Sequence, residues 1–439
     1  MREETRKHWI SLFMVAAILI CLLASTLKVL AAAPLMKGNV ITSFTGQQGK
    51  VTDRFGNTIV DSNTACPDLL VNLIGDTYGI IPNSILGKYQ NELTPSFNVF
   101  TGIHSLENAK GSILTTTLLP LSAQEAIASA FNGSNGVCVA IDYTTGDVLC
   151  CLSLPSALDT SETALAGSLF NKALNSGYIP GSTMKIVTTV LALEDPNIDL
   201  ETFTAFCNGE LELADGTSVS CTGQHGAVDI TEAIGVSCNE FFAALAQSLG
   251  IESANHALNS LGIYTDTEET HDQYVDTLWK ASSSTTFQDR GFQSTWSLVG
   301  QGNTIVNPID MLSICGAIAS GTGETAGPRF VRSIYDQDKD IVRYESKEER
   351  IQLIDPEIAS SAKEFWRSAY KNWYTDISYG HYSAKTGTIQ TSGGNHRALL
   401  GYMDAYNVCY FIYVEASIST SELFQIAQTL DDQLRLYYI

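Results

Sequence analysis

Basic residues are scarce in this sequence. Lys and Arg total 25 against 47 Asp and Glu, so the formal net charge is -22. Such a balance repels a phosphate backbone, and no cluster of basic residues interleaved with aromatic residues provides a local exception. The composition therefore excludes nucleic acid as a partner.

Charged residues of both signs are also few, at 16%, whereas hydrophobic residues make up 44%. This balance is typical of a folded globular protein and excludes a disordered chain. The sequence contains no internal repeat and no low-complexity tract. Its 439 residues are enough for one large domain or for two to three smaller ones.

Cysteine and histidine patterns typical of metal sites are missing. The ten cysteines include no C-x-x-C pair and no Cys-His spacing common in zinc sites, so we expect no metal and no cofactor. The seven histidines lie in no motif typical of a Ser-His-Asp triad, and His225 and His396 are interpreted as loop or core residues.

Cys207 and Cys221 flank a short polar segment that we predict to be a hairpin. A disulfide between them is possible if the chain is exported, because disulfides persist in oxidising compartments. The alternative is that the cysteines inside apolar runs are small buried residues without a bond.

Residues 9–27 form an uncharged apolar stretch, with Arg2, Arg6 and Lys7 before it and Lys28 after it. The stretch is long enough to cross a bilayer. It predicts a cytoplasmic tail at 1–8, a single signal-anchor helix at 9–27 and an extracytoplasmic body. The alternative is a cleaved signal peptide, with Ala31-Ala32-Ala33 as the cleavage site.

Residues 28–110 are predicted to form a small N-terminal pedestal or linker module. Within it, residues 49–60 form two β-like runs around a turn rich in Asp, Gly and Asn, which indicates a hairpin. The rest of this module is irregular, with scattered Gly, Pro and Asn. No residue pattern there supports chemistry.

Regular structure is predicted from Gly111 onward. We expect a strand at 112–119, a helix that begins at a Ser122-x-x-Glu125 capping box, and a hairpin formed by residues 136–141 and 147–152. A second capping box, Asp229-x-x-Glu232, begins another helix.

The C-terminal third contains three successive β-like runs, at 382–390, 397–403 and 408–415, which predict adjacent antiparallel strands. The helix expected from Ser421 has one apolar face suited to covering them. Together with helices at 240–249 and 308–319, this predicts one α+β domain over 111–439, with a helical region and an antiparallel sheet flanked by helices.

The motif Ser182-x-x-Lys185 is a candidate for catalytic chemistry. Pro180 and Gly181 indicate a loop, and the apolar run after Ser182 predicts a helix, so Ser182 is expected at the start of that helix. Residues three apart share a helix face, where an unprotonated lysine could accept the serine proton. The pattern recurs at Ser360-x-x-Lys363 and Ser368-x-x-Lys371, so it is not specific alone.

Two further motifs follow Ser182 along the chain. Ser237-x-Asn239 lies between two predicted helices, and Lys385-Thr386-Gly387-Thr388 lies in the first of the C-terminal strands. Three motifs in this order, each in a compatible element, favour a functional interpretation over chance.

In this order the motifs resemble those of the penicillin-binding protein transpeptidase domain and its serine β-lactamase relatives. Residues 136–149 and 171–174 and the tripeptide Gly300-Gln301-Gly302 are similar to segments of class B penicillin-binding proteins, the monofunctional transpeptidases. The resemblance is strong from Gly111 to the C-terminus and loose before it. It implies a short-pedestal member of that class.

The resemblance implies a role for each motif residue. Ser182 would attack the carbonyl of the penultimate D-Ala of a peptidoglycan stem peptide, and Lys185 would accept its proton. Ser237 would relay a proton, and Asn239 would position Lys185 and the substrate. Lys385 would attract the substrate's terminal carboxylate.

The remaining implied roles concern substrate binding. Thr386 and Thr388 would donate hydroxyl groups to the carboxylate, and Gly387 would leave room for the acyl group against the strand. The backbone N–H groups of Ser182 and Thr388 would form the oxyanion hole.

The implied function is a serine D,D-transpeptidase that is acylated by β-lactam antibiotics and works beside a membrane glycosyltransferase. Three alternatives stay open within the resemblance. A D,D-carboxypeptidase would use water as acceptor, a serine β-lactamase would need a fast deacylating water, and a β-lactam sensor or scaffold would acylate once or never.

Overall fold

The computed structural model describes residues 49–61, 63–76, 81, 83–93, 111–156, 170–265, 273–275, 279–337, 342–374 and 382–438. The predicted cytoplasmic tail and signal-anchor helix lie outside these residues. Among the described residues, no helix is both long enough and apolar enough to span a bilayer.

A five-stranded antiparallel sheet forms the centre of the molecule. Its order is β18-β19-β20-β4-β5, with strands β4 (Gly136–Asp142), β5 (Val148–Leu154), β18 (Tyr382–Thr391), β19 (Gly394–Met403) and β20 (Val408–Val414). All residues of β4, β5 and β20 are buried, because helices cover both faces of the sheet. The predicted hairpin and the three predicted C-terminal strands are confirmed.

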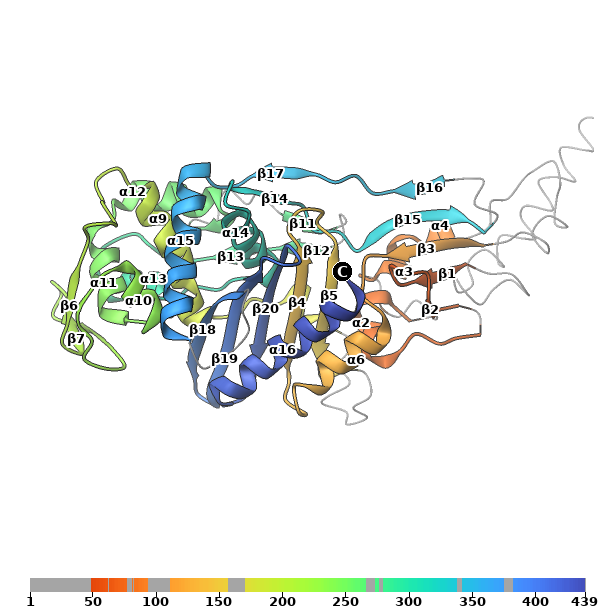
Figure 1. The fold of residues 1–439 in the computed structure, drawn as a ribbon, viewed down its shortest axis with the longest axis horizontal. Helices are drawn as coiled ribbons and strands as arrows, with labels where there is room; N and C mark the ends of the chain where they lie inside the picture. Colours follow the sequence, from red (N-terminus) through yellow and green to blue (C-terminus); the bar gives the residue numbers. More distant parts are fainter. Residues whose placement is uncertain are drawn as a thin grey trace, which may run out of the picture.

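Two helices cover one face of this sheet, α6 (Leu121–Ser129) and α16 (Thr420–Tyr437), as Figure 1 shows. The apolar face of α16 is buried as predicted, through Leu423, Ile426, Ala427, Leu430 and Leu434. The capping box predicted at Ser122 is wrong, because α6 begins at Leu121 and the residue at its N-cap is Pro120. The Ser122 hydroxyl lies 3.2 Å from the Tyr437 hydroxyl instead.

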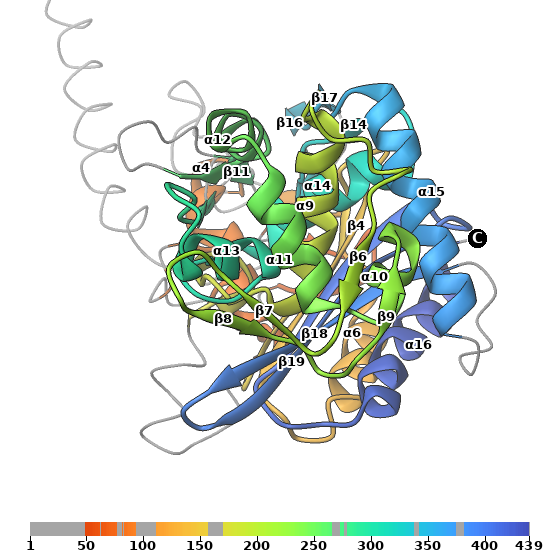
Figure 2. The same ribbon diagram turned by 90° about the vertical axis from the view of Figure 1, so that its left-hand side faces the viewer.

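The other face of the sheet packs against the helical region. Its helices are α8 (Lys172–Asn175), α9 (Met184–Glu194), α10 (Ile230–Gly235), α11 (Asn239–Ser248), α12 (Ile251–Ser260), α13 (Phe292–Val299), α14 (Pro308–Ser320) and α15 (Pro356–Trp373). Helix α10 begins at the predicted capping box, in which Asp229 and Glu232 each accept a hydrogen bond from the other's backbone N–H. Figure 2 shows these helices from their outer end.

Short strand pairs lie at the edges of the helical region. They are β6 (Ala205–Cys207) with β9 (Gly226–Val228), β7 (Glu210–Glu212) with β8 (Ser218–Ser220), β10 (Ile263–Tyr264) with β13 (Ser283–Ser284), and β11 (Gln273–Val275) with β12 (Trp279–Ala281). The β7 and β8 pair is the hairpin predicted between Cys207 and Cys221.

A second sheet lies at the opposite end of the molecule, in the order β16-β15-β3-β1-β2. Its strands are β1 (Lys50–Thr52), β2 (Thr58–Val60), β3 (Ser112–Thr116), β15 (Val331–Asp336) and β16 (Val342–Glu345). The hairpin predicted at 49–60 is confirmed as β1 and β2. Short helical turns pack beside this sheet, η1 (Asp68–Leu70), α2 (Val71–Ile74), α3 (Ile85–Lys88) and α4 (Gln90–Leu93).

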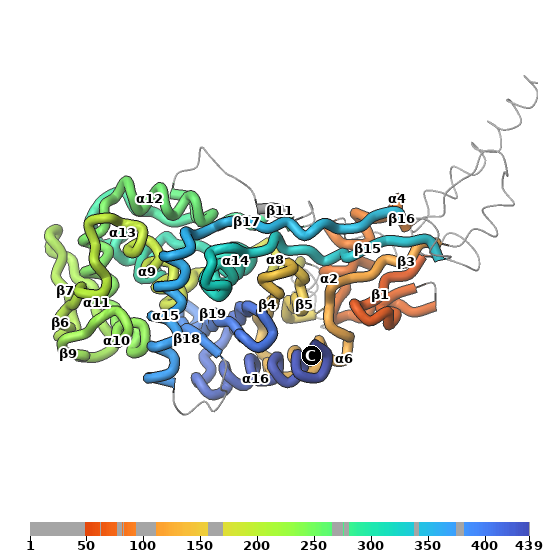
Figure 3. The backbone as a smooth tube through the Cα atoms, turned by 45° about the horizontal axis from the view of Figure 1, so that its top comes forward, coloured from red at the N-terminus to blue at the C-terminus, as the bar shows by residue number. Residues whose placement is uncertain are grey.

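The second sheet crosses the boundary that the sequence predicts at Gly111. Strand β3 follows that boundary and pairs with β1 on one side and β15 on the other. The strand pairs β14 (Glu324–Ala326) with β17 (Arg350–Gln352) and β15 with β16 together run from the helical region to this sheet, as Figure 1 shows. Figure 3 shows the same course for β15, β16 and β17. This second sheet, β16-β15-β3-β1-β2, is called the pedestal sheet below, and it is built from residues on both sides of the predicted boundary.

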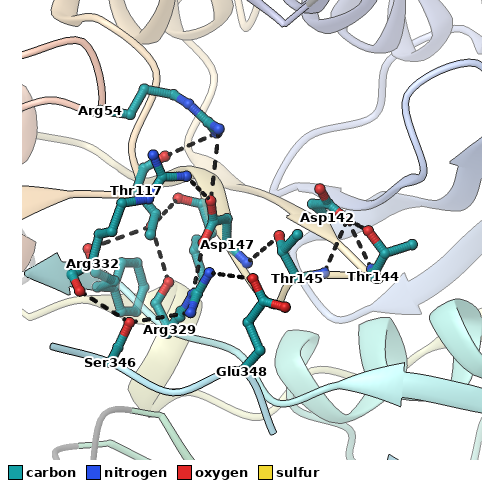
Figure 4. A network of polar contacts seen from close by, with 12 residues as sticks. Arg54, Thr117, Asp142, Thr144, Thr145, Asp147, Arg329, Arg332, Ser346 and Glu348 are labelled. Carbon is teal, nitrogen blue, oxygen red and sulfur yellow. Dashed lines mark hydrogen bonds and ion pairs between the residues drawn. The ribbon is translucent and has the colours of Figure 1, made fainter. Parts of the chain in front are cut away.

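A buried carboxylate joins the two sheets. Asp147, in the turn between β4 and β5, is 1% exposed and contacts three guanidinium groups (Figure 4). The ion-pair distances are 3.6 Å to Arg54, 2.7 Å to Arg329 and 2.6 Å to Arg332. Arg54 comes from the turn between β1 and β2, and the other two arginines come from the start of the β15 segment. The turn of the central sheet is therefore fixed to the pedestal sheet by charge.

We predict that Asp147→Asn destabilises the protein by about 3 kcal/mol, because it leaves partly buried guanidinium groups without their shared counter-ion. The control is Glu324→Gln, which removes an exposed pair with Arg350 and is expected to cost less than about 1 kcal/mol. Denaturant unfolding of both variants measures the difference. Equal effects would mean that the Asp147 cluster does not stabilise the contact between the sheets.

Candidate active site

Ser182 lies where the sequence predicts it, at the start of a helix. It occupies a 3₁₀ turn, η2 (Gly181–Thr183), that leads directly into α9. The Thr183 hydroxyl donates to the Pro180 carbonyl at 2.7 Å and fixes the turn. Ser182 is partly exposed between two buried neighbours, so its hydroxyl is available to a ligand while its backbone is held.

Lys185 is the second residue of α9 and is fully buried. Its Nζ donates to the Ser237 carbonyl at 2.7 Å, to Asn239 Oδ1 at 2.7 Å and to Ser237 Oγ at 3.2 Å. Burial lowers the pKa of Lys185 to about 7, which the nearby Cys221 and Cys238 partly oppose. The amine is therefore poised to exist in its neutral form near neutral pH.

Ser237 is the meeting point of two motifs. It lies between α10 and α11 with a positive φ of 58°, an uncommon conformation for a residue other than glycine. Its hydroxyl oxygen lies 3.2 Å from Lys185 Nζ and 3.0 Å from Lys385 Nζ. One hydroxyl group therefore connects the helix-borne lysine to the strand-borne lysine.

Asn239 is the first residue of α11 and is held at both ends of its amide. Its Oδ1 accepts from Lys185 Nζ, and its Nδ2 donates to the Ser220 carbonyl at 3.1 Å. The amide orientation is therefore fixed by the β7 and β8 hairpin, and it presents an oxygen to the lysine.

Lys385 lies in β18 and is fully buried as well. Besides Ser237 Oγ, its Nζ donates to the Thr386 carbonyl at 3.0 Å. Burial lowers its pKa well below the usual value, and the charges of Lys185 and Arg397 lower it further. In the described part of the chain, neither buried lysine makes an ion pair with a carboxylate.

The absence of a counter-ion governs the chemistry of this lysine pair. Two buried ammonium groups that share one acceptor repel each other, so the cluster favours a state in which at least one amine is neutral. A neutral amine beside a hydroxyl can accept a proton and pass it on. The arrangement is suited to proton transfer without a histidine.

Strand β18 packs directly against the Ser182 turn. A Cβ on Gly387 would lie 2.8 Å from the Pro180 carbonyl oxygen, so only glycine allows this contact. Thr386 Oγ1 lies 3.1 Å from the hydroxyl of Tyr374, and the Thr388 side chain is exposed. The predicted binding residues 386–388 thus border Ser182, on the edge of the sheet that has no further strand beyond β18 among the described residues.

The tripeptide Gly300-Gln301-Gly302 also borders Ser182, although the sequence indicated no role for it. Gly300 ends α13 in a left-handed conformation, with a φ of 103°, and its Cβ would lie 1.8 Å from the Gly181 carbonyl oxygen. Gln301 Nε2 donates to the Thr388 carbonyl at 3.0 Å. This loop therefore joins the Ser182 turn to β18, a role visible only in three dimensions.

The sequence leaves a Cys207–Cys221 disulfide possible, but the structure does not form it. Both cysteines are free, and each sulfur lies near His225 Nδ1, at 3.4 Å from Cys207 and 3.6 Å from Cys221. The hairpin between them is present, but the backbone turns both thiols toward a third group instead of toward a mutual bond. The disulfide that the sequence left possible is therefore absent from this structure.

The other two Ser-x-x-Lys matches lie together on α15. Ser360 is exposed, and Lys363 pairs with Asp404 at 3.1 Å. They have the ordinary surroundings of a partly solvated helix.

Sequence comparison places these residues in a known context. Residues 136–423 match the family model described as the penicillin binding protein transpeptidase domain. Among characterised proteins, the chain is 25% identical over 295 residues to the peptidoglycan D,D-transpeptidase PbpA of Mycolicibacterium smegmatis, covering 60% of this chain and 56% of that protein. It is 24% identical over 323 residues to the peptidoglycan D,D-transpeptidase MrdA of Acinetobacter baumannii, covering 68% and 47%. The chain thus spans about half the length of these relatives.

Solved structures share the fold. The crystal structure of PBPA from Mycobacterium tuberculosis has a TM-score of 0.72 at 19% identity, covering 89% of this chain and all of that one. The D,D-transpeptidase domain of a peptidoglycan glycosyltransferase from Eggerthella lenta has a TM-score of 0.71 at 20% identity, covering 89% and 99%. Because the matched family region spans most of the chain and holds the three motifs, the chain belongs to the penicillin-binding protein transpeptidase family, as the class B resemblance predicts.

Proposed function

We propose that this protein is a serine D,D-transpeptidase that crosslinks peptidoglycan stem peptides and is acylated by β-lactams. The observation that carries the proposal is the Ser237 hydroxyl shared by Lys185 and Lys385, beside the turn that presents Ser182. The two similar proteins named peptidoglycan D,D-transpeptidase support the same substrate class.

In the proposed acylation step, the Ser182 hydroxyl oxygen attacks the carbonyl carbon of the penultimate D-Ala. The neutral amine of Lys185 accepts the hydroxyl proton as the ester bond forms. The C–N bond to the terminal D-Ala then breaks, and the proton passes through Ser237 to the departing amine. The backbone N–H groups of Ser182 and Thr388 stabilise the oxyanion, a contribution of about 3 kcal/mol per donor.

In the proposed deacylation step, the amine of a second stem peptide attacks the ester carbonyl. Its proton returns through the same lysine and serine groups, and the Ser182 hydroxyl is restored. Lys385, Thr386 and Thr388 hold the terminal carboxylate of the donor peptide before the first step, and Gly387 leaves space for the acyl chain beside β18. Asn239 holds Lys185 in place in both steps.

The proposal also concerns location and partners. Residues 9–27 would anchor the chain in the membrane by one helix, with the catalytic domain on the extracytoplasmic side where its substrate lies. A membrane glycosyltransferase would supply the glycan strand, and the anchor and the pedestal sheet are the surfaces we propose for that contact. The uncharged stretch at 9–27 and the family membership support this arrangement.

We predict that Ser182→Ala abolishes covalent labelling by fluorescent penicillin, because Ser182 is the proposed nucleophile and alanine has no hydroxyl group to form the ester. Ser360→Ala is the matched control, since it removes the exposed serine of another Ser-x-x-Lys pattern and is expected to label as the wild type does. Labelling is read by gel fluorescence, and the adduct is located by peptide mass. An adduct retained in Ser182→Ala would contradict the assignment.

We predict that the acylation rate rises with pH through about 7, because the neutral fraction of Lys185 rises there. Asn239→Asp places a carboxylate against the amine and favours its charged form. The pKa of Lys185 then rises. The pH at which the acylation rate increases is therefore expected to move up by about 1 pH unit or more.

The acylation rate is measured by stopped flow between pH 5.5 and 9, roughly the range either side of this pKa. Ser248→Asp is the control, because it adds the same charge at an exposed position on α11. If the pH dependence of the acylation rate is unchanged in Asn239→Asp, another group controls the proton transfer.

Product analysis separates the proposed activity from its alternatives. With a synthetic stem-peptide donor, we expect D-Ala release together with a crosslinked product once an acceptor amine is added. Release without crosslinking would indicate a D,D-carboxypeptidase. Rapid penicillin turnover without a trapped adduct would indicate a β-lactamase, and no acylation of Ser182 would indicate a sensor or scaffold.

A further inference from the structure

Four potential metal ligands converge beside the second motif. They are Cys207 at the end of β6, Cys221 after β8, His225 before β9, and Cys238 between α10 and α11. Their sulfur and nitrogen atoms all lie within 4.8 Å of one another. This cluster was not predicted from the sequence, because its ligands come from three separate segments, with Cys221 and His225 in one loop, and include no C-x-x-C pair.

Three distances within the cluster are close to those of a tetrahedral site. At zinc bond lengths of about 2.3 Å to sulfur and about 2.05 Å to nitrogen, two sulfurs lie about 3.8 Å apart, and a sulfur and a nitrogen about 3.6 Å apart. The Cys221 and Cys238 sulfurs are 3.9 Å apart. His225 Nδ1 lies 3.4 Å from the Cys207 sulfur and 3.6 Å from the Cys221 sulfur.

A disulfide does not explain the same geometry. A disulfide brings two sulfurs to about 2.05 Å, and it would leave the imidazole and the third thiol without a reason to face them. The single atom Nδ1 of His225 points at two sulfurs at once, and it can share a proton with only one of them. A cation at the centre satisfies all four ligands together.

The surroundings of the sulfurs also resemble the outer shell of a metal site. The backbone N–H of Asn239 donates to the Cys221 sulfur at 3.3 Å, and that of Phe241 donates to the Cys238 sulfur at 3.4 Å. Such donors stabilise thiolate ligands and fix their direction. Cys207 and Cys238 are buried, at 1% and 0% exposed, so the centre is closed to solvent on that side.

We propose that Cys207, Cys221, His225 and Cys238 bind one zinc ion. Three sulfurs and one imidazole nitrogen form a common structural zinc set, and all four positions are filled by protein, which leaves none for a reacting water. The expectation of no metal, drawn from sequence spacing, is thereby revised. The role of the ion is structural, since it does not contact Ser182 or the lysines.

Its place in the fold gives the site a function in positioning. Cys238 lies between Ser237 and Asn239, the two residues that hold Lys185. A zinc ion on Cys238 fixes this loop to the strand pairs β6 with β9 and β7 with β8. Glu240 is a buried residue of α11 that accepts hydrogen bonds from the backbone N–H groups of Asn208 and Gly209 at 3.0 Å each. It supports the same contact between this loop and the strand pairs.

The test begins with metal content. The full chain is purified in detergent without chelators, and its metal content is measured by elemental mass spectrometry. We expect about one zinc ion per chain. Cys207→Ser and His225→Ala are expected to lower this content about tenfold or more, whereas Cys66→Ser, which changes a cysteine outside the cluster, is expected to leave it unchanged. A wild-type content no higher than that of the ligand variants would overturn the proposal.

A second measurement does not depend on whether the variants fold. After zinc is removed from the wild-type chain by a chelator, added Co²⁺ is expected to give the intense visible absorption of a tetrahedral thiolate site, and zinc is expected to bleach it. Mass spectrometry after alkylation without reduction checks the competing bond. A Cys207–Cys221 disulfide in the purified chain, or weak octahedral cobalt absorption, would overturn the proposal.

The positioning role is tested by acylation of Ser182, and this part rests on the proposed function. Removal of zinc is expected to slow penicillin acylation about tenfold, and zinc, but not Mg²⁺, is expected to restore it. If zinc is present but its removal leaves acylation unchanged, the positioning role is overturned and the metal site stands. If Ser182 is never acylated, the proposed function fails independently of the zinc content.

Discussion

The active site depends on one partly buried hydroxyl group shared by two buried lysines. Ser237 Oγ lies within 3.2 Å of Lys185 and 3.0 Å of Lys385. Because the two lysines belong to a helix and to a sheet edge, the hydroxyl fixes how these parts of the fold meet. Burial without a counter-ion favours a state in which at least one of the amines is neutral, and a neutral amine is the base that a serine nucleophile needs. The burial that packs the two lysines into the fold therefore also makes a neutral amine available for proton transfer.

Around this centre, contacts of the backbone set the shape of the site. Gly387 and Gly300 let β18 and the end of α13 approach the Ser182 turn more closely than any side chain would permit. The loop that carries Ser237 is held from its other side by the groups around Cys238. The three motifs thus meet because each is fixed by a different kind of constraint: strand packing, helix termination and a cluster of sulfur ligands.

Much of the fold could be predicted from the sequence where one strong local signal dominates. The three C-terminal strands, the apolar face of α16 and the Asp229 capping box follow from periodicity and from side-chain caps. The Ser122 box was wrong because Pro120 begins the helix first. The role of Gln301 and the cluster around His225 could not be predicted, because both depend on segments that are distant in the sequence and meet only after folding.

The pedestal sheet has a consequence for how the chain can be divided. Strand β3 pairs on one side with β1 and on the other with β15, so it has no free edge in the intact molecule. A fragment beginning at Gly111 would retain β3 but lose β1, and a row of backbone donors and acceptors would become exposed. Such bare edges recruit strands from other chains. Residues 50–52 therefore protect the edge of β3 from pairing with another chain. The smallest fragment of this protein that stays soluble is expected to include β1.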